Sequence, residues 1–313
     1  MSRDTRSRSR SQPDPTSISS SAETGPPNAP DEMDPVAARP LLEVIQPDDP
    51  EFDDADDPAP DEEFDDGATE FPRTVMITGA SGNIGRKLRA AWVGMYDLVL
   101  IDSAADADDP EVLPIDLAEM TEDLVDAFAG VDTVVHLAGN PNEFASWEEL
   151  ERPNLDALSN VFLAAMLAGV ERVIFASSNH AMGGYRELGD MLIGVELPPR
   201  PDSPYGATKL MGERLGRGLS AAFEMTFIAL RLGWVQSGEN RPDTLPDEWA
   251  RAMWLSNRDV VQLFECAIEA ELDDPAFVIA NGMSNNRGMR WDLTETIELL
   301  GYEPEDDAYA EEL

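Results

Sequence analysis

A short apolar run followed by three closely spaced glycines constrains the fold of this chain more than any other feature. Residues 74–78 (Thr-Val-Met-Ile-Thr) predict a buried strand, and residues 83–92 predict a helix. The junction carries Gly79, Gly82 and Gly85. Glycine permits a tight turn and lets backbone N–H groups approach a pyrophosphate, which the positive end of a helix also favours. Although the spacing is G-x-x-G-x-x-G instead of the commoner G-x-G-x-x-G, this order of elements indicates a dinucleotide-binding unit.

Apolar runs alternate with helical segments along the rest of the chain. Beyond the first strand and helix, we expect strands at residues 96–101, 112–116, 132–138, 172–178, 225–232 and 277–281. We expect further helices at residues 121–129, 147–169, 204–223, 259–271 and 293–300. Strands that are apolar on both faces and alternate with helices indicate a parallel sheet. The predicted class is therefore α/β, a Rossmann-type doubly wound parallel sheet with a small C-terminal substrate cap after residue 232.

The charge of the chain separates a tail from a domain. Residues 1–72 are rich in Pro, Asp, Glu and Ser, so we expect a disordered acidic N-terminal tail before a Rossmann-type domain at residues 73–313. The formal net charge of −41 disfavours nucleic acid and anionic membranes as partners. Such a surface suits a cytosol with molar salt, where the Debye length falls to about 3 Å. We interpret the chain as a halophilic protein.

Cysteine and histidine are too few for a disulfide framework or a metal centre. The chain has one cysteine, Cys266, and two histidines, His136 and His180. No apolar run approaches the roughly 20 residues that span a bilayer. Residues 1–12 alternate Ser and Arg without the apolar core of a secretory signal. We therefore expect a cytoplasmic protein without a bound metal or a membrane partner.

Residues that follow the predicted strands complete the expected cofactor site. Asp102 closes the second strand, where a carboxylate can accept hydrogen bonds from the adenosine ribose and repels a 2′-phosphate. NAD is therefore favoured over NADP. Residues expected to border the adenine or the nicotinamide ribose are Asp116, Leu117, Leu137, Ala138 and Gly139. His136 is interpreted as a packed strand residue and not as a catalytic base.

A second group of residues predicts proton transfer beside the cofactor. Tyr205 and Lys209 stand four residues apart in a predicted helix and so share one face. Tyrosine has an ordinary pKa of about 10, which a neighbouring ammonium and the positive nicotinamide would lower. Lys209 is also expected to hold the ribose hydroxyls of the cofactor. Ser178 ends a predicted strand, at the sheet edge where doubly wound proteins bind ligands. Together these residues indicate an NAD-linked centre that oxidises an alcohol.

The glycine turn, Ser178 and the Tyr205–Lys209 pair together resemble the extended short-chain dehydrogenases/reductases over about residues 73–305. This resemblance implies that Tyr205 is the general base, that Lys209 activates it and that Ser178 orients the substrate. It also implies further cofactor contacts, from Ser81, Asn83, Ile84, Asn154 and Ser177. Relatives commonly dimerise through the helices that match residues 147–169 and 204–223, so we expect a homo-oligomer.

Three short segments narrow the resemblance: residues 175–180 (Phe-Ala-Ser-Ser-Asn-His), 231–233 (Arg-Leu-Gly) and 252–256 (Ala-Met-Trp-Leu-Ser). They are similar to segments of uronate dehydrogenases and of haloarchaeal NAD-dependent glucose-6-phosphate dehydrogenases, which oxidise the anomeric C1 of a sugar to a lactone. The resemblance implies that Asn179, His180 and Arg231 face the sugar. The planar fork of Arg231 would suit a carboxylate.

The sequence leaves the sugar open. Trp234 stands where those relatives have Ser or Asn, and residues 140–142 (Asn-Pro-Asn) supply no cation for a phosphate. An unphosphorylated sugar or a uronic acid is therefore favoured, while Arg241, Arg251 and Arg258 keep a sugar phosphate possible.

Two other function classes use a similar framework. A nucleotide-sugar epimerase or dehydratase uses the same triad but keeps its NAD, and the small C-terminal part argues against its bulky substrate. A non-catalytic dinucleotide-binding protein can lose the Tyr–Lys pair, which this chain retains.

Overall fold

The computed structural model describes residues 72–106, 109–273 and 275–310. The predicted acidic tail, apart from residue 72, lies outside the described residues. Within them, no helix is long and apolar enough to cross a membrane. The same residues contain no group of three or more His, Cys, Asp or Glu side chains placed to hold a metal ion.

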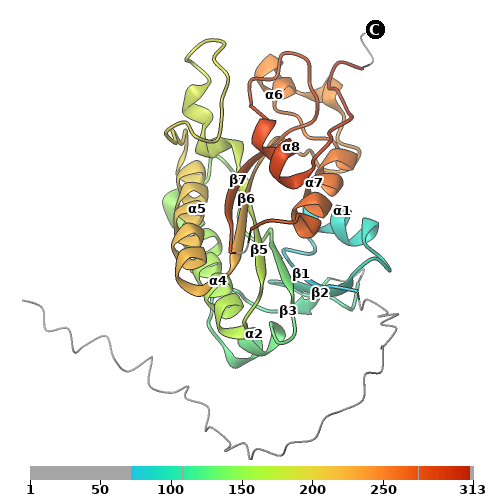
Figure 1. The fold of residues 1–313 in the computed structure, drawn as a ribbon, viewed down its shortest axis with the longest axis vertical. Coiled ribbons are helices and arrows are strands. Elements are labelled where there is room, and N and C mark those ends of the chain that lie inside the picture. The colour runs from blue at the N-terminus through green and yellow to red at the C-terminus, as the bar shows by residue number, and fades with distance from the viewer. Residues whose placement is uncertain (1–71, 107–108, 274, 311–313) are drawn as a thin grey trace, which may run out of the picture. The chain divides into compact units, whose positions relative to one another are not determined.

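Seven parallel strands form one sheet in the order β3-β2-β1-β4-β5-β6-β7 (Figure 1). The strands are β1 Thr74–Thr78, β2 Asp97–Asp102, β3 Leu113–Pro114, β4 Thr133–His136, β5 Arg172–Ser178, β6 Thr226–Leu232 and β7 Phe277–Gly282. The strand order reverses between β1 and β4. β1 pairs with β2 on one side and with β4 on the other, so the chain extends the sheet first in one direction and then in the other. This arrangement confirms the doubly wound Rossmann-type fold and places the ligand-binding crevice at the carboxyl ends of the strands.

Helices cover both faces of the sheet, with α2, α4 and α5 on one face and α1, α7 and α8 on the other (Figure 1). The α-helices are α1 Asn83–Ala91, α2 Glu122–Ala127, α3 Trp147–Leu150, α4 Ala157–Ala168, α5 Pro204–Phe223, α6 Glu248–Ala252, α7 Asn257–Glu269 and α8 Thr294–Leu300. Consecutive residues of β1 enter different cores, since Val75 packs in one hydrophobic cluster and Met76 in the other. The strands are apolar on both faces because each face packs against a hydrophobic cluster.

The helix expected at residues 147–169 is interrupted. A π-helical turn, Glu151–Asp156, separates α3 from α4, and the Ala157 N–H donates to the carbonyl of Arg152, five residues back. Pro153 lies within this turn and has no N–H for the regular ladder, which accounts for the wider turn. The predicted end is confirmed, because Gly169 closes α4 in the left-handed conformation at φ 72°.

The N-terminus of α5 is fixed against the end of β5. Ser203 accepts a hydrogen bond from the Gly206 N–H at 3.0 Å, and Pro204 occupies the first turn. Farther along α5, a Cβ at Gly212 would lie 2.6 Å from the ring of Phe175. The glycine therefore lets α5 lie directly on the strand that ends in the predicted catalytic serine.

Candidate active site

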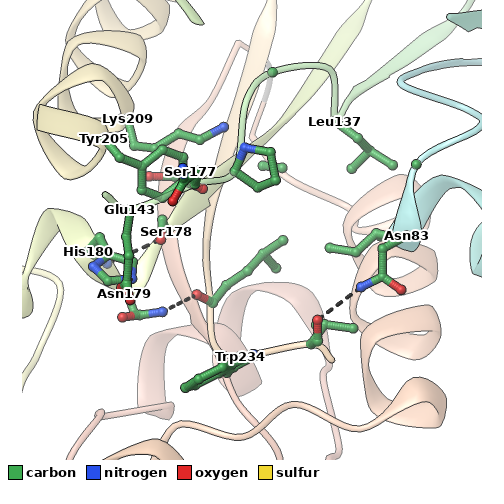
Figure 2. A pocket seen from close by; sticks show the side chains of 18 of the residues that line it. Asn83, Leu137, Glu143, Ser177, Ser178, Asn179, His180, Tyr205, Lys209 and Trp234 are labelled. Carbon is green, nitrogen blue, oxygen red and sulfur yellow. Dashed lines mark hydrogen bonds and ion pairs between the residues drawn. The ribbon is translucent and has the colours of Figure 1, made fainter. Parts of the chain in front are cut away.

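Two adjoining cavities occupy the carboxyl ends of the strands, one of about 540 Å³ and one of about 470 Å³. Both are lined by residues of the glycine turn and of the segment after β4, namely Gly79, Gly82, Leu137, Gly139 and Asn140. The first cavity also contains the end of β5, the first turns of α5 and the segment after β6 (Figure 2). The second continues towards the ends of β2 and β3. The pair thus follows the crevice in which a doubly wound sheet binds a dinucleotide.

The glycine turn leaves no space for side chains. Gly79 adopts φ +77°, and a Cβ there would lie 2.8 Å from the backbone nitrogen of Ala138. A Cβ at Gly85 would lie 2.3 Å from the carbonyl oxygen of Gly79. These close approaches hold the start of α1 against the ends of β1 and β4, with the helix N-terminus beside the cavity.

Asp102 closes β2 and lines the second cavity. Its Oδ2 accepts from the Ser81 N–H at 2.9 Å and its Oδ1 from the Ser103 N–H at 2.8 Å. Asp102, Asp116, Leu117 and Ala138 all line the second cavity, where the sequence predicted the adenosine contacts. Ser81 reaches this site through its backbone, and its side chain is absent from the lining of both cavities.

Ser178, Tyr205 and Lys209 converge on the first cavity (Figure 2). The Ser178 side chain is close enough to the Tyr205 phenol to influence its pKa, and the Lys209 Nζ lies 5.6 Å from the centroid of the Tyr205 ring. The same ammonium lies 5.0 Å from the centroid of the Phe175 ring. All three predicted catalytic side chains are buried at the base of the cavity.

Burial dominates the proton affinities of these groups. It raises the pKa of Tyr205 to about 12, the hydrogen bond with Ser178 opposes this rise, and the charge of Glu143 adds to it. Burial lowers the pKa of Lys209 to about 8. The predicted lowering of the Tyr205 pKa by Lys209 and the positive nicotinamide is not seen in the chain alone, where burial is the largest influence, and it stays a prediction for the complex with the cofactor. A further positive charge beside the phenol is needed before Tyr205 becomes a base near neutral pH.

The π-helical turn places Asn154 beneath the segment after β4. The side-chain oxygen of Asn154 accepts from the Asn140 N–H at 2.8 Å, and its amide donates to the Asn140 carbonyl at 3.1 Å. Asn154 is buried and lines neither cavity, so it supports the cofactor region from behind. A direct cofactor contact by Asn154 stays a prediction. His136 is buried beside it in the core and hydrogen-bonds Thr78 at 2.7 Å, as a packed strand residue.

His180 lies between two carboxylates. Its Nε2 is 2.8 Å from Glu143 and its Nδ1 is 2.9 Å from Asp202. Its ring also meets the Tyr205 ring edge-on, with 5.7 Å between centroids. Asn179, beside it, lines the same cavity and donates to the Leu232 carbonyl at 3.1 Å. Sequence reasoning missed Glu143, although its position in the loop after β4, at the carboxyl edge of the sheet, was a usable signal.

Arg231 does not face the cavity as the sequence predicted. Its guanidinium donates to both carboxylate oxygens of Glu213 at 2.8 Å, and both side chains are 1% exposed. The Ser177 hydroxyl donates to the same carboxylate at 2.7 Å. Because β6 is a fully buried central strand, an arginine in it requires a buried acid, and α5 supplies one. The planar fork that would suit a sugar carboxylate is thus occupied by Glu213.

Asn83 ties the glycine turn to the segment after β6. Its side-chain amide donates to the Val235 carbonyl at 2.9 Å, and Lys87 donates to the Asn83 side-chain oxygen at 2.5 Å. Ile84 and Trp234 line the cavity on either side of this contact. Asn83 therefore contributes to the shape of the cofactor region through a loop contact as well as through its place in the turn.

These features define the class of the protein. The glycine turn has room for no side chain larger than hydrogen. With the acidic residue at the end of β2 and the buried Ser–Tyr–Lys group, it forms a dinucleotide-dependent oxidoreductase site on a Rossmann-type fold. The chain belongs to the NAD dependent epimerase/dehydratase family, which matches residues 75–256.

Relatives in this family include characterised sugar dehydrogenases. L-arabinose 1-dehydrogenase (NAD(P)⁺) of Haloferax volcanii is 34% identical over 250 residues, which cover 75% of this chain and 97% of the relative. NAD-dependent glucose-6-phosphate dehydrogenase of the same organism is 35% identical over 254 residues, or 75% of this chain and 94% of the relative. The crystal structure of uronate dehydrogenase from Agrobacterium tumefaciens superposes with a TM-score of 0.66 at 31% identity, over 76% of this chain and 86% of that one.

Proposed function

We propose that this chain is an NAD-dependent dehydrogenase that oxidises the anomeric C1 hydroxyl of a sugar to a lactone. The observation that carries the proposal is the convergence of Ser178, Tyr205 and Lys209 at the base of a cavity that continues into the glycine turn. The sugar dehydrogenases among its relatives support the same chemistry, and those named for NAD support the cofactor. NAD, when bound, supplies the carbon that accepts the hydride.

The side chains of this chain divide the remaining work. Ser178 holds the C1 oxygen, and Tyr205 removes its proton through the phenol oxygen. Lys209, an ammonium below about pH 8, stabilises the phenolate from beneath the ring and holds the ribose hydroxyls of the cofactor. Asn179 and His180 contact the sugar ring from the end of β5. Asp102 accepts the hydroxyls of the adenosine ribose and disfavours the phosphate of NADP.

The proposal also covers the salt concentration and the oligomeric state in which the protein works. The net charge of −41 fits a halophilic cytoplasm, in which salt screens the repulsion between acidic groups. Exposed apolar residues at helical spacing on two neighbouring helices fit a homo-oligomer that pairs these faces, namely Leu163 and Leu167 on α4 and Met211 and Leu215 on α5. Light scattering in molar KCl tests this, and a monomer at micromolar concentration would contradict it.

The test of the activity follows NADH formation in molar KCl with arabinose, galactose, glucose 6-phosphate, galacturonate and UDP-sugars. Stoichiometric NADH from one free sugar is the expected result. Epimerisation of a UDP-sugar without net NADH would instead favour the hypothesis that the chain is a nucleotide-sugar epimerase.

The matched variant is Tyr205→Phe, which keeps the ring and removes the phenol oxygen. We expect kcat to fall by at least about 100-fold, the usual contribution of a positioned base. NAD binding, measured by quenching of tryptophan fluorescence, should change less than about threefold, since the glycine turn and Asp102 are untouched. Turnover at the wild-type rate would remove Tyr205 from its assigned role.

A further inference from the structure

The wall of the cavity that a sugar would meet carries almost no positive charge. Among the described residues that line the 540 Å³ cavity, Lys209 is the one Lys or Arg side chain. Its ammonium lies beneath the Tyr205 and Phe175 rings, where it serves the base and the cofactor. A substrate phosphate or carboxylate is normally held by a guanidinium fork, and no arginine among the described residues lines this cavity.

The four arginines considered for binding an anionic sugar are engaged elsewhere. Arg231 is paired with buried Glu213, as described above. Arg241 pairs with Asp243 at 2.7 Å. Arg258 pairs with the C-terminal acids Glu305 and Asp306, at 2.9 and 2.6 Å. Arg251 lies over the Tyr309 ring, 5.3 Å from its centroid. None of the four belongs to the cavity wall, so none presents its charge to a bound sugar.

A carboxylate occupies the place where a cation would be needed. Glu143 lies beside His180, Asn179 and Tyr205 on one side of the cavity (Figure 2). Asp202 holds the other nitrogen of the same imidazole. Two carboxylates face one imidazole, so the group carries a negative charge at neutral pH whether or not His180 is protonated. An anionic substituent on the sugar would meet repulsion here.

The rest of this wall suits hydroxyl groups and a sugar ring. Asn140, Asn142 and Asn179 bring side-chain amides to the lining, and amides both donate to and accept from hydroxyls. Trp234, which is 38% exposed, brings an aromatic side chain to the same lining (Figure 2). A few oriented polar groups beside an aromatic surface are typical of a site for a small neutral ligand.

We propose, building on the function proposed above, that the substrate is a neutral aldose. The sugar carries no phosphate and no carboxylate, and Glu143 is the residue that rejects sugars bearing either. Uronic acids and sugar phosphates are therefore poor substrates of this chain.

The test compares sugars that share a ring and differ at one substituent. D-galactose, L-arabinose and D-galacturonate carry CH₂OH, H and a carboxylate at C5, while D-glucose, D-xylose and glucose 6-phosphate form the second set. The full chain is assayed with NAD in molar KCl, and kcat/KM is compared within each set. In the set that is turned over, we expect a neutral sugar to exceed the anionic one by at least about tenfold, the scale of one like-charge contact near a protein surface.

Glu143→Gln tests the assigned residue. The amide keeps a hydrogen-bonding partner for His180 and removes the charge, so the ratio of neutral to anionic kcat/KM should fall about tenfold. Glu171→Gln, the same change at an exposed residue just before β5 and so at the opposite edge of the sheet, should leave the ratio unchanged. Should Glu143→Gln fail to fold, Asn142→Asp adds a carboxylate to the same wall and should raise the ratio.

Each outcome has a separate meaning. Galacturonate or glucose 6-phosphate turned over as well as its neutral counterpart would overturn the neutral substrate and leave the dehydrogenase function standing. A ratio that does not respond to Glu143→Gln or to Asn142→Asp would overturn the role of Glu143. If no sugar yields NADH although NAD binds, the proposed function itself is wrong, and the substrate class falls with it.

Discussion

Replacing Arg231 with methionine distinguishes a structural arginine from a substrate-binding one. The change removes the guanidinium and leaves Glu213 buried at 1% exposure with one partner, the Ser177 hydroxyl. Removing one member of a buried ion pair costs about 3–5 kcal/mol, because the remaining charge is neither solvated nor paired. For a domain of this size each kcal/mol lowers Tm by about 2–4 °C, so we expect a fall of about 6–20 °C.

The assay is thermal unfolding followed by circular dichroism, with the variant compared at two KCl concentrations. A buried pair is screened little, so the loss in Tm should be similar at both. Arg241→Met is the matched control, since Arg241 and its partner Asp243 are 60% and 55% exposed. Exposed pairs contribute about 0–1 kcal/mol, and the control should therefore unfold within a few degrees of the wild type.

The double variant Arg231→Met/Glu213→Leu sharpens the result. Replacing both charges by apolar groups removes the stranded carboxylate, so most of the lost stability should return. The opposite pattern would refute the structural role: a Tm within 2 °C of wild type for Arg231→Met, together with a tenfold rise in KM for a sugar. That result would restore Arg231 to the substrate site.

Three other perturbations follow from the same geometry. Because burial lowers the pKa of Lys209 from 10.5 to about 8, the folded chain binds fewer protons than the unfolded chain between these values. The burial cost is complete below about pH 8 and disappears towards pH 10.5, so denaturant titrations should show wild-type stability rising by about 3 kcal/mol more than that of Lys209→Met across this window. Asp102→Asn should raise the NADP-to-NAD ratio of kcat/KM at least about tenfold, and an unchanged ratio would exclude contact with the ribose. Gly85→Ala should destabilise by about 1–3 kcal/mol through its clash with the turn, whereas Gly218→Ala, which meets nothing within 4 Å, should stabilise by about 0.5–1 kcal/mol.

Most of the fold was predictable from local pattern. The runs that became β1, β5 and α5 have the predicted bounds, because apolar runs, a serine N-cap and terminal glycines act over a few residues. The interruption by Glu151–Asp156 was harder, since the residues on both sides of it favour a helix. Pro153 was the visible signal, and a proline inside a helical pattern should have lowered the expectation of one regular helix.

The site was predictable where chemistry fixes both residue type and spacing. Tyr205 and Lys209 share a helix face, and Ser178 stands at the end of a strand. Their spacing and their places in the predicted elements were enough to predict that they lie close together. The pairs Arg231–Glu213 and His180–Glu143 depend on tertiary packing instead. In a chain with 63 acidic residues, an arginine or histidine has many candidate partners, and only the packing of α5 on the sheet selects the right one.

The use of lysine in this chain follows from the same excess of acid. A guanidinium stays charged and its fork matches a carboxylate, so arginines here pair readily with nearby acids. Lysine is a point charge whose pKa falls on burial, and of the two lysines of the chain Lys209 lines the first cavity and Lys87 hydrogen-bonds a residue that does. Lys209 stands beneath the base, and Lys87 holds Asn83 and the Gln236 carbonyl. The compact ammonium suits both positions, whereas the planar fork of an arginine would seek a carboxylate instead.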